Sequence, residues 1–171
     1  LKAECAQATG SFKIRGALNV MTQLSSRGTD RVIAFSSGNH GIGVAYAAQC
    51  LAMTATIVVP QDAPEAKIER IRRLGGDIVF YDRLSEDREQ VASALQDKSP
   101  APLVKPYDDW QTIAGQGTCG AEVIMQLPEG IDAAIICTGG GGLAAGIGTY
   151  LKSRSFETRI FTAEPHGWHD H

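Results

Sequence analysis

Two spacings of apolar residues alternate along this chain. Ile14, Ala17, Leu18, Met21 and Leu24 repeat at the period of an amphipathic helix. Short unbroken apolar runs between such segments have the length and β-branched content of buried strands. We predict strands at residues 32–35, 54–59, 77–81, 103–105, 133–138 and 159–164. We predict helices at residues 14–24, 41–52, 64–74, 109–127 and 142–152, and a further one around residues 91–95. This alternation predicts an α/β fold with parallel sheets flanked by helices.

Capping residues indicate where three of these helices begin. Pro64 stands at the expected N1 position of its helix. Ser85 is a candidate cap for the helix around residues 91–95, and Asp108 or Asp109 is a candidate cap for the helix that follows.

The composition is that of an ordinary folded protein. Sixteen Lys and Arg residues against 19 Asp and Glu residues give a net charge of −3, without the basic excess typical of a nucleic-acid-binding surface. The longest apolar runs fall far short of a membrane span. We therefore expect neither nucleic acid nor a membrane as a partner.

The four cysteines are too widely spaced for a zinc or redox pair, since no two lie closer than 18 residues. Cys50 lies in a helix-like run and Cys137 in a strand-like run, so we expect both to be buried free thiols in a reducing compartment, the cytoplasm. Because the chain begins at Leu1, we expect it to be a piece of a longer protein.

Three loops that follow predicted strands have an unusual composition. The carboxyl ends of strands are where ligands bind in open parallel sheets. The loops are Ser36-Ser37-Gly38-Asn39-His40-Gly41, Thr138-Gly139-Gly140-Gly141-Gly142 and Glu164-Pro165-His166-Gly167-Trp168-His169-Asp170. Four successive glycines before a helix provide a curved row of amides, an arrangement that binds phosphate.

Lys13 opens a predicted helix, where the macrodipole disfavours a cation. The same field lowers the pKa of a lysine and favours the neutral amine that forms a Schiff base. A solvated surface lysine is the alternative. Together, a lysine amine, a phosphate loop and an Asn/Ser loop suggest pyridoxal phosphate as the cofactor.

Four motifs, met in order along the chain, resemble those of the threonine dehydratase and serine racemase group of pyridoxal-phosphate enzymes. They are Ser11-Phe12-Lys13-Ile14-Arg15-Gly16-Ala17, Ser36-Ser37-Gly38-Asn39-His40-Gly41, Ala114-Gly115-Gln116-Gly117-Thr118 and the tetraglycine loop. The resemblance covers essentially the whole chain and implies fold type II, present as a fragment, in a homo-oligomer. It implies a larger, incomplete cofactor-binding domain of residues 1–30 and 109–171 and a smaller domain of residues 31–108.

The resemblance also implies a role for each motif. Lys13 would form the Schiff base with pyridoxal phosphate and then remove the α-proton of the substrate. Phe12 would pack near the cofactor ring, and Asn39 would bond the ring hydroxyl. The phosphate would be held by the amides of Gly139, Gly140, Gly141, Gly142 and Leu143. The amino-acid substrate would be bound by Ser36, Ser37, Asn39 and His40, with Ser37 as a second acid/base. Helix capping by the serines and a helix-start role for His40 are the alternatives.

Some members of the group hold a divalent cation after a Glu-Pro pair like Glu164-Pro165. The ligands implied here are the carboxylates of Glu164 and Asp170 and the carbonyl of Trp168. Such oxygen ligands suit Mg²⁺ or Ca²⁺. Ordinary solvated polar residues are the alternative.

The implied reaction is β-elimination from a β-hydroxy amino acid such as threonine, serine or 3-hydroxyaspartate, which yields a 2-oxo acid and ammonia. Racemisation of serine through Ser37 is the nearest alternative. The glycine loop also fits a dinucleotide fingerprint, with Glu164 lying 24 residues past Gly140. An NAD-dependent dehydrogenase would, however, leave Lys13 and the Asn39 loop unexplained. Binding of the cofactor or a partner without turnover is a third possibility.

Overall fold

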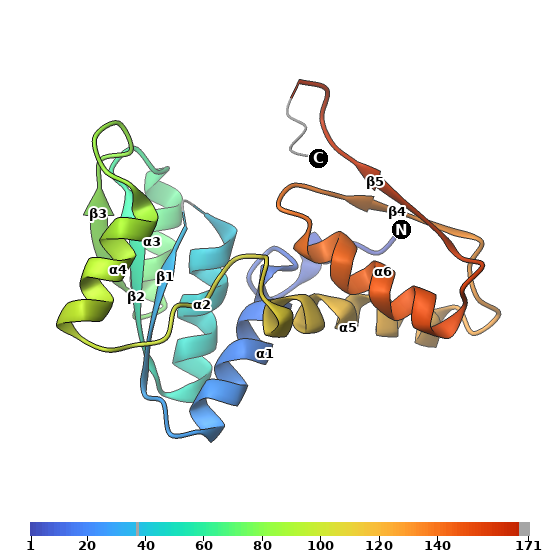
Figure 1. The fold of residues 1–171 in the computed structure, drawn as a ribbon, viewed down its shortest axis with the longest axis horizontal. Helices are drawn as coiled ribbons and strands as arrows, with labels where there is room; N and C mark the ends of the chain where they lie inside the picture. Colours follow the sequence, from blue (N-terminus) through green and yellow to red (C-terminus); the bar gives the residue numbers. More distant parts are fainter. Residues whose placement is uncertain (37, 168–171) are drawn as a thin grey trace.

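The computed structural model is an α/β fold with two lobes, described for residues 1–36 and 38–167 (Figure 1). The helices are α1 (Lys13–Ser26), α2 (Asn39–Leu51), α3 (Glu65–Arg73), α4 (Arg88–Lys98), α5 (Trp110–Gln126) and α6 (Gly142–Arg154), with a 3₁₀ turn, η1 (Glu4–Ala6). The strands are β1 (Arg31–Phe35), β2 (Thr54–Pro60), β3 (Asp77–Tyr81), β4 (Ala133–Cys137) and β5 (Arg159–Ala163).

Three parallel strands form the sheet of the first lobe, in the order β1-β2-β3. Val58 of the middle strand lies opposite Phe35 on one side and Val79 on the other. The carboxyl ends of the strands therefore lie along one edge of the sheet, and the loop that leads into α2 leaves from that edge.

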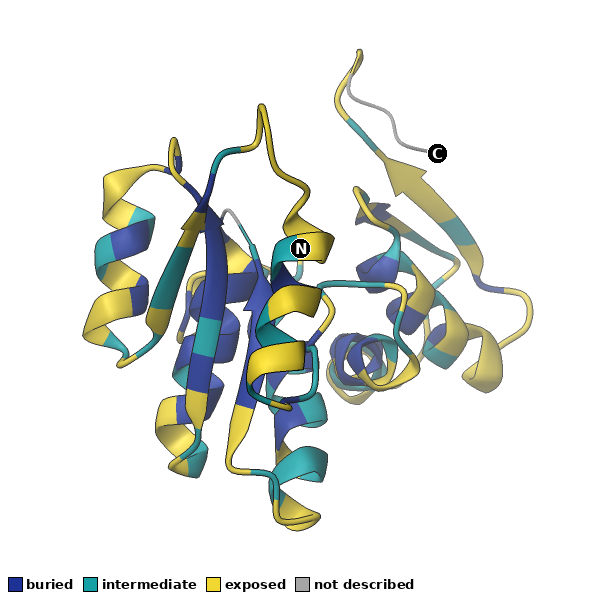
Figure 2. Cartoon of the chain, turned by 60° about the vertical axis from the view of Figure 1, so that its left-hand side comes forward, coloured by how far each residue is buried: buried dark blue, intermediate teal, exposed yellow. Residues whose placement is uncertain are grey.

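Successive residues of β1 face opposite helical layers, because side chains alternate along a strand. Val32 and Ala34 belong to the apolar core shared with α2 and α3. Ile33 and Phe35 point to the other side and cluster with Ala92 of α4. Figure 2 shows these strands buried, with exposed residues on the outer faces of the helices. Burial on both faces is the usual state of parallel sheets.

The second lobe contains the two parallel strands β4 and β5 beside α5 and α6 (Figure 1). Ile136 packs with Leu143 and Ile147 of α6 on the covered face. On the other face, Ile135 and its register partner Phe161 are 77% and 47% exposed. This sheet is thus covered by the described residues on one side.

The α/β fold predicted from the apolar pattern is confirmed, and most element boundaries lie within two residues of the predicted ones. The predicted strand at residues 103–105 is wrong, because only Leu103 pairs, in an isolated bridge with Ile33. Ser85 is not the cap of α4; the Asp87 carboxylate accepts from the amides of Glu89 and Gln90 instead. Similarly, Pro64 precedes the first helical residue of α3, so it is the N-cap rather than N1.

Burial of Cys50 and Cys137 was a wrong expectation, since both are exposed; Cys119 is the buried cysteine, and all four are free thiols. Cys137 lies on the same open face of β4 as Ile135, because the two are two residues apart in a strand. In the part of the chain that the structure describes, no helix is long and apolar enough to cross a membrane.

Helix α5 lies between α1 and α6 and touches the backbone of both. A Cβ added at Gly115 would lie 2.6 Å from both the Arg15 carbonyl oxygen and the Gly16 Cα. On the opposite side of α5, a Cβ at Gly146 would lie 2.5 Å from the Ile113 carbonyl oxygen. Real Cβ atoms do not approach this closely, so only glycine permits such contacts. The Ala114-Gly115-Gln116-Gly117-Thr118 motif is therefore a helix-packing element.

An ion-pair cluster anchors the start of α1. The Arg15 guanidinium donates to both carboxylate oxygens of Glu4, at 2.6 and 2.8 Å, and to those of Glu122 on α5, at 2.7 and 2.8 Å. Lys2 also pairs with Glu122. The Arg15 side chain is only 7% exposed, and such bidentate pairs fix geometry as well as charge. The cluster therefore holds the first turn of α1 against α5.

The glycine contacts predict a position-specific effect of adding one methyl group to α6. Gly146→Ala in the full-length protein should lower the free energy of unfolding by about 1–3 kcal/mol, the usual result of overpacking. Gly148→Ala is the matched control in the same helix, because its Cβ would meet Ile160 at an ordinary 3.6 Å. The control should be neutral or stabilise by up to about 1 kcal/mol, as alanine does in helices. Urea unfolding measures both, and equal effects of the two substitutions would contradict this packing.

Candidate active site

Lys13 is the first residue of α1, and its half-buried side chain turns toward the segment before α5. The ammonium donates to the carbonyl oxygen of Pro106 at 2.8 Å. It lies 5.1 Å from the ring centroid of Phe12 and 5.7 Å from that of Tyr107. Burial lowers the pKa of Lys13 to about 8. The cause is the loss of water around the amine.

The tetraglycine loop leads directly into α6. Gly141 is the N-cap with a φ of 73°, a left-handed conformation that favours glycine. Gly141 has no side chain that could cap the helix, so the amides of the first turn of α6 can bind a ligand placed before them. A Cβ added at Gly139 would meet nothing within 4 Å. Amides at a helix start beside open space are an anion-binding arrangement.

Tyr107 connects the lysine with the glycine loop. A Cβ at Gly140 would lie 2.5 Å from the Tyr107 ring, and a Cβ at Gly142 would lie 3.2 Å from the Tyr107 Cβ. The same ring lies beside the Lys13 ammonium. Tyr107 is not among the site residues predicted from the sequence, because an aromatic residue after a proline in a short loop carries no chemical signature. The only available signal was its position just before the Asp109 cap of α5.

The second predicted loop brings the start of α2 close to Lys13. A Cβ at Gly43 of α2 would lie 3.4 Å from the Lys13 carbonyl group. The Ser36 hydroxyl accepts from the Gly38 amide at 3.0 Å, and Asn39 is exposed at the first position of the helix. Ser37 lies outside the described residues.

His40 is buried, and its Nε2 lies 2.8 Å from the Val104 carbonyl oxygen. Burial, reinforced by the nearby Lys13 charge, lowers the pKa of His40 to about 4. The ring is therefore neutral at pH 7 and held by backbone. A substrate-binding role for its side chain stays a prediction.

The cation site predicted after β5 is only partly within the described residues. Glu164 is half-buried, whereas Trp168 and Asp170 lie outside that range. Among the residues that the structure describes, no group of three His, Cys, Asp or Glu side chains is placed to hold a metal. The cation site stays a prediction.

The packing thus places Phe12, Tyr107 and the first turns of α2 beside Lys13, and Tyr107 in turn contacts the glycine loop. Two other hollows lie elsewhere, one at the N-terminal segment and one of about 380 Å³ between α5 and α6. None of the predicted site residues lines either of them. The site combines an amine of lowered pKa with a row of amides suited to phosphate. This donor set fits a phosphorylated aldehyde, and such a site on a parallel α/β fold defines a pyridoxal-phosphate type of protein.

Comparison with known proteins gives the same class. All residues, 1–171, match the family model described as pyridoxal-phosphate dependent enzyme, and the chain belongs to this family. It is 40% identical to an L-threo-3-hydroxyaspartate ammonia-lyase of Pseudomonas sp, over 99% of the chain and 53% of that protein. It is 41% identical to a serine racemase of Oryza sativa subsp. indica, over 99% of the chain and 50% of that protein.

Solved structures agree in fold. The structure of maize serine racemase superposes with a TM-score of 0.91 at 41% identity, covering 96% of this chain and 50% of that one.

A further sequence relative, a threonine dehydratase of Solanum lycopersicum, is 43% identical over 98% of the chain and 28% of its own length. Apart from this longer plant protein, these relatives are about twice as long as the chain.

The burial of Lys13 predicts an unusual titration. Trace acetylation of the cofactor-free, full-length protein, followed by peptide mapping, should show Lys13 reactivity rising with a midpoint near pH 8. Free lysine in the same reaction, with a pKa of about 10.4, is the internal standard.

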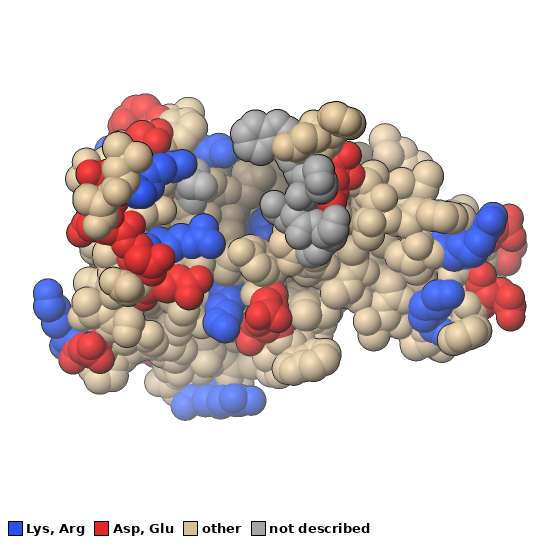
Figure 3. Space-filling model, turned by 45° about the horizontal axis from the view of Figure 1, so that its top comes forward, with Lys and Arg blue, Asp and Glu red and all other residues tan. Residues whose placement is uncertain are grey.

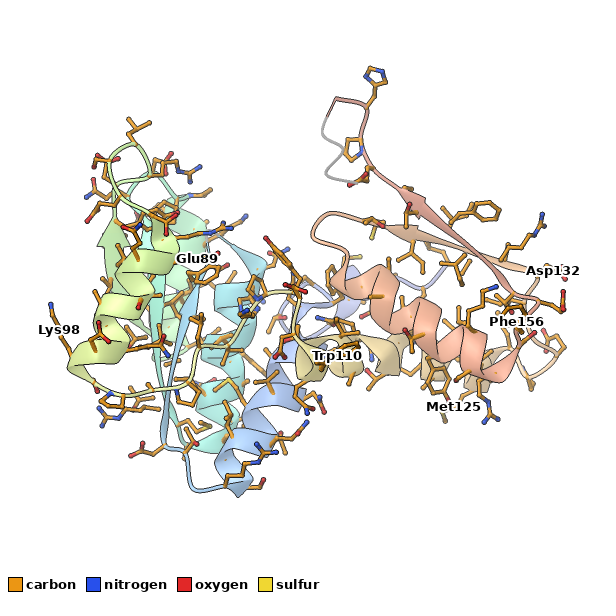
Figure 4. The ribbon with its side chains drawn as sticks, in the orientation of Figure 1. Glu89, Lys98, Trp110, Met125, Asp132 and Phe156 are labelled. Atoms are coloured by element: carbon orange, nitrogen blue, oxygen red, sulfur yellow. The ribbon has the colours of Figure 1, made fainter. Side chains whose placement is uncertain are left out.

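Tyr107→Ala should move this midpoint upward by admitting water. The cation–π contact that is lost is worth only about 0.5–1 kcal/mol, less than one pKa unit, so desolvation dominates. Trp110→Ala, an exposed aromatic three residues along the chain, is the control (Figure 4). A midpoint for Lys13 equal to that of free lysine would contradict the burial.

Proposed function

We propose that the full-length protein is a pyridoxal-phosphate-dependent ammonia-lyase acting on a β-hydroxy amino acid, such as serine, threonine or 3-hydroxyaspartate. The observation that carries the proposal is Lys13, a half-buried amine of lowered pKa beside the Tyr107 ring, which also contacts the glycine loop that opens α6. Identity of 36–43% to proteins named as ammonia-lyases, threonine dehydratases and serine racemases supports it.

In this proposal, different residues of the chain hold different parts of the cofactor. Lys13 holds its aldehyde carbon, and the amides of residues 139–143 hold its phosphate. Phe12 and Tyr107 wall the space between these two anchors, and Asn39 bonds the ring hydroxyl. When bound, pyridoxal phosphate stabilises the negative charge left on the substrate's α-carbon.

The other residues bind the substrate and move its protons. Amides at the amino end of α2 and the Ser36 hydroxyl hold the α-carboxylate, because a helix start attracts anions. The Lys13 amine accepts the α-proton, and its pKa of about 8 keeps a useful fraction unprotonated near neutral pH. The β-hydroxyl then takes up a proton and leaves as water. The resulting enamine tautomerises to an imine, and a second water molecule hydrolyses the imine to the 2-oxo acid and ammonia. Return of a proton from Ser37 to the opposite face would give racemisation instead.

The proposal also covers the organisation of the whole protein. We assign residues 1–30 and 109–171 to a larger domain, residues 31–108 to a smaller one, and the complete protein to a cytoplasmic homo-oligomer. The four free thiols agree with a reducing compartment.

Product analysis tests the activity. The complete protein, loaded with pyridoxal phosphate, should release ammonia and a 2-oxo acid from at least one of L-serine, L-threonine and L-threo-3-hydroxyaspartate. Lys13→Ala should lower the rate by about 10³-fold or more, because it removes the base as well as the attachment point. Lys98→Ala, at the far end of α4 (Figure 4), should leave the rate unchanged. Formation of D-serine without ammonia would replace the lyase assignment by racemisation.

A Mg²⁺ or Ca²⁺ ion bound by Glu164, Trp168 and Asp170 is a further part of the proposal. Chelation with EDTA should lower the unfolding temperature of the complete protein, because an ion that binds only the folded state stabilises it. The Glu164→Gln variant should no longer respond to EDTA. An identical response of variant and wild type would remove Glu164 from the ligand set.

A further inference from the structure

One face of α3 carries Lys67 and Arg70, and it lies over two loops, one containing Gly38 and the other containing Gly10. Lys67 and Arg70 are three residues apart in this helix, so they share one face. A Cβ at Gly38, at the start of α2, would lie 2.8 Å from the Lys67 ammonium nitrogen. A Cβ at Gly10, three residues before Lys13, would lie 3.5 Å from the Arg70 Nη1 atom. The Arg70 Nη2 atom also donates to the Ala8 carbonyl oxygen at 3.2 Å.

The described part of the protein does not neutralise these two cations. The acids of α3, Glu65 and Glu69, pair with Arg72, and Asp62 pairs with Arg83. Within residues 1–36 and 38–167, none of the ion pairs includes Lys67 or Arg70. Like charges at this spacing on a helix repel one another. An anion placed between them would relieve the repulsion.

Packing fixes this face relative to the reacting amine. Ile71 of α3 packs against the first turn of α2, where a Cβ at Gly41 would lie 3.2 Å from the Ile71 Cδ1 atom. The next turn of α2, at Gly43, packs on the Lys13 backbone. Figure 3 looks onto the hollow between the lobes, and Lys or Arg atoms are visible within it. The cations of α3 are therefore attached to the same packed unit that carries Lys13.

We propose that Lys67 and Arg70 bind the side-chain carboxylate of the substrate, so that the preferred substrate is a β-hydroxy amino acid with a second carboxylate, such as 3-hydroxyaspartate. This inference rests on the proposed function and narrows its substrate class. The amino end of α2, where the N-cap residue Gly38 has no side chain, already provides amides for one carboxylate. Lys67 and Arg70 add two cations that are not required to bind this one carboxylate. A guanidinium also has the planar geometry that carboxylates match best.

Paired substrates test the assignment in the full-length, cofactor-loaded enzyme. Lys67→Gln and Arg70→Gln should each lower kcat/KM for L-threo-3-hydroxyaspartate by about tenfold or more, as expected for loss of a hydrogen bond to a charged group. The value for L-serine should be unchanged in both. Lys98→Gln is the control for loss of one positive charge. Equal losses for both substrates, or no loss for either, would overturn the proposal.

A binding measurement keeps this inference separate from the lyase assignment. By calorimetry, succinate should bind the protein more tightly than butyrate, and the double variant Lys67→Gln/Arg70→Gln should lose the difference. Absence of ammonia release from all three amino acids would refute the proposed function, yet the succinate preference would still decide the role of α3. Equal binding of succinate and butyrate by the wild type would overturn that role.

Discussion

Backbone-to-backbone contact along α5 is the constraint on which the site depends. Helix α5 separates α1, which begins with Lys13, from α6, which begins with the glycine loop. Gly115 and Gly146 let both neighbours approach to distances that any side chain would prevent. The Arg15 pairs with Glu4 and Glu122 then fix the end of α1 that carries the lysine. Helix packing thus holds the Lys13 amine and the glycine loop in place, which suits the proposed site, because that site must fix both ends of one cofactor.

Desolvation sets the chemistry inside this frame. Lys13 and His40 are two titratable groups near the start of α2, and burial lowers the pKa of both. The His40 ring is neutral at pH 7, whereas Lys13 is an amine whose protonation changes near physiological pH. Their difference comes from the reference pKa of each side chain and from how completely each is buried.

Much of the fold could be predicted from the sequence because its information is local. Unbroken apolar runs locate β1, β2 and β3, and the glycine run locates the start of α6. Properties that depend on tertiary packing could not be predicted. Cys137 looked buried because its strand is apolar, but the described residues cover only one face of that sheet. This agrees with a chain that spans about half the length of most of the relatives compared here.

The site residues also differ in whether the local sequence or only the tertiary packing reveals them. Lys13 and the glycine loop were recognisable because a helix-start lysine and four successive glycines are locally costly. Tyr107 was not recognisable, since its place in the site depends on its contact with Gly140, 33 residues away in the chain. The packing role of Gly115 could not be predicted either, because it depends on the close contact with the backbone of α1. In the sequence, Lys67 and Arg70 belong to an ordinary charged helix. Their position over Gly38 and Gly10 is visible only in the structure.

The central claim is that Lys13 is the amine that binds pyridoxal phosphate. The most direct test is to add the cofactor to the full-length protein, make the bond permanent with borohydride, and locate the label by peptide mapping. We expect a single pyridoxyl group, on Lys13, which is lost in Lys13→Ala while labelling elsewhere stays at background. Labelling of another lysine in preference to Lys13, or no stable labelling of the folded protein, would contradict it.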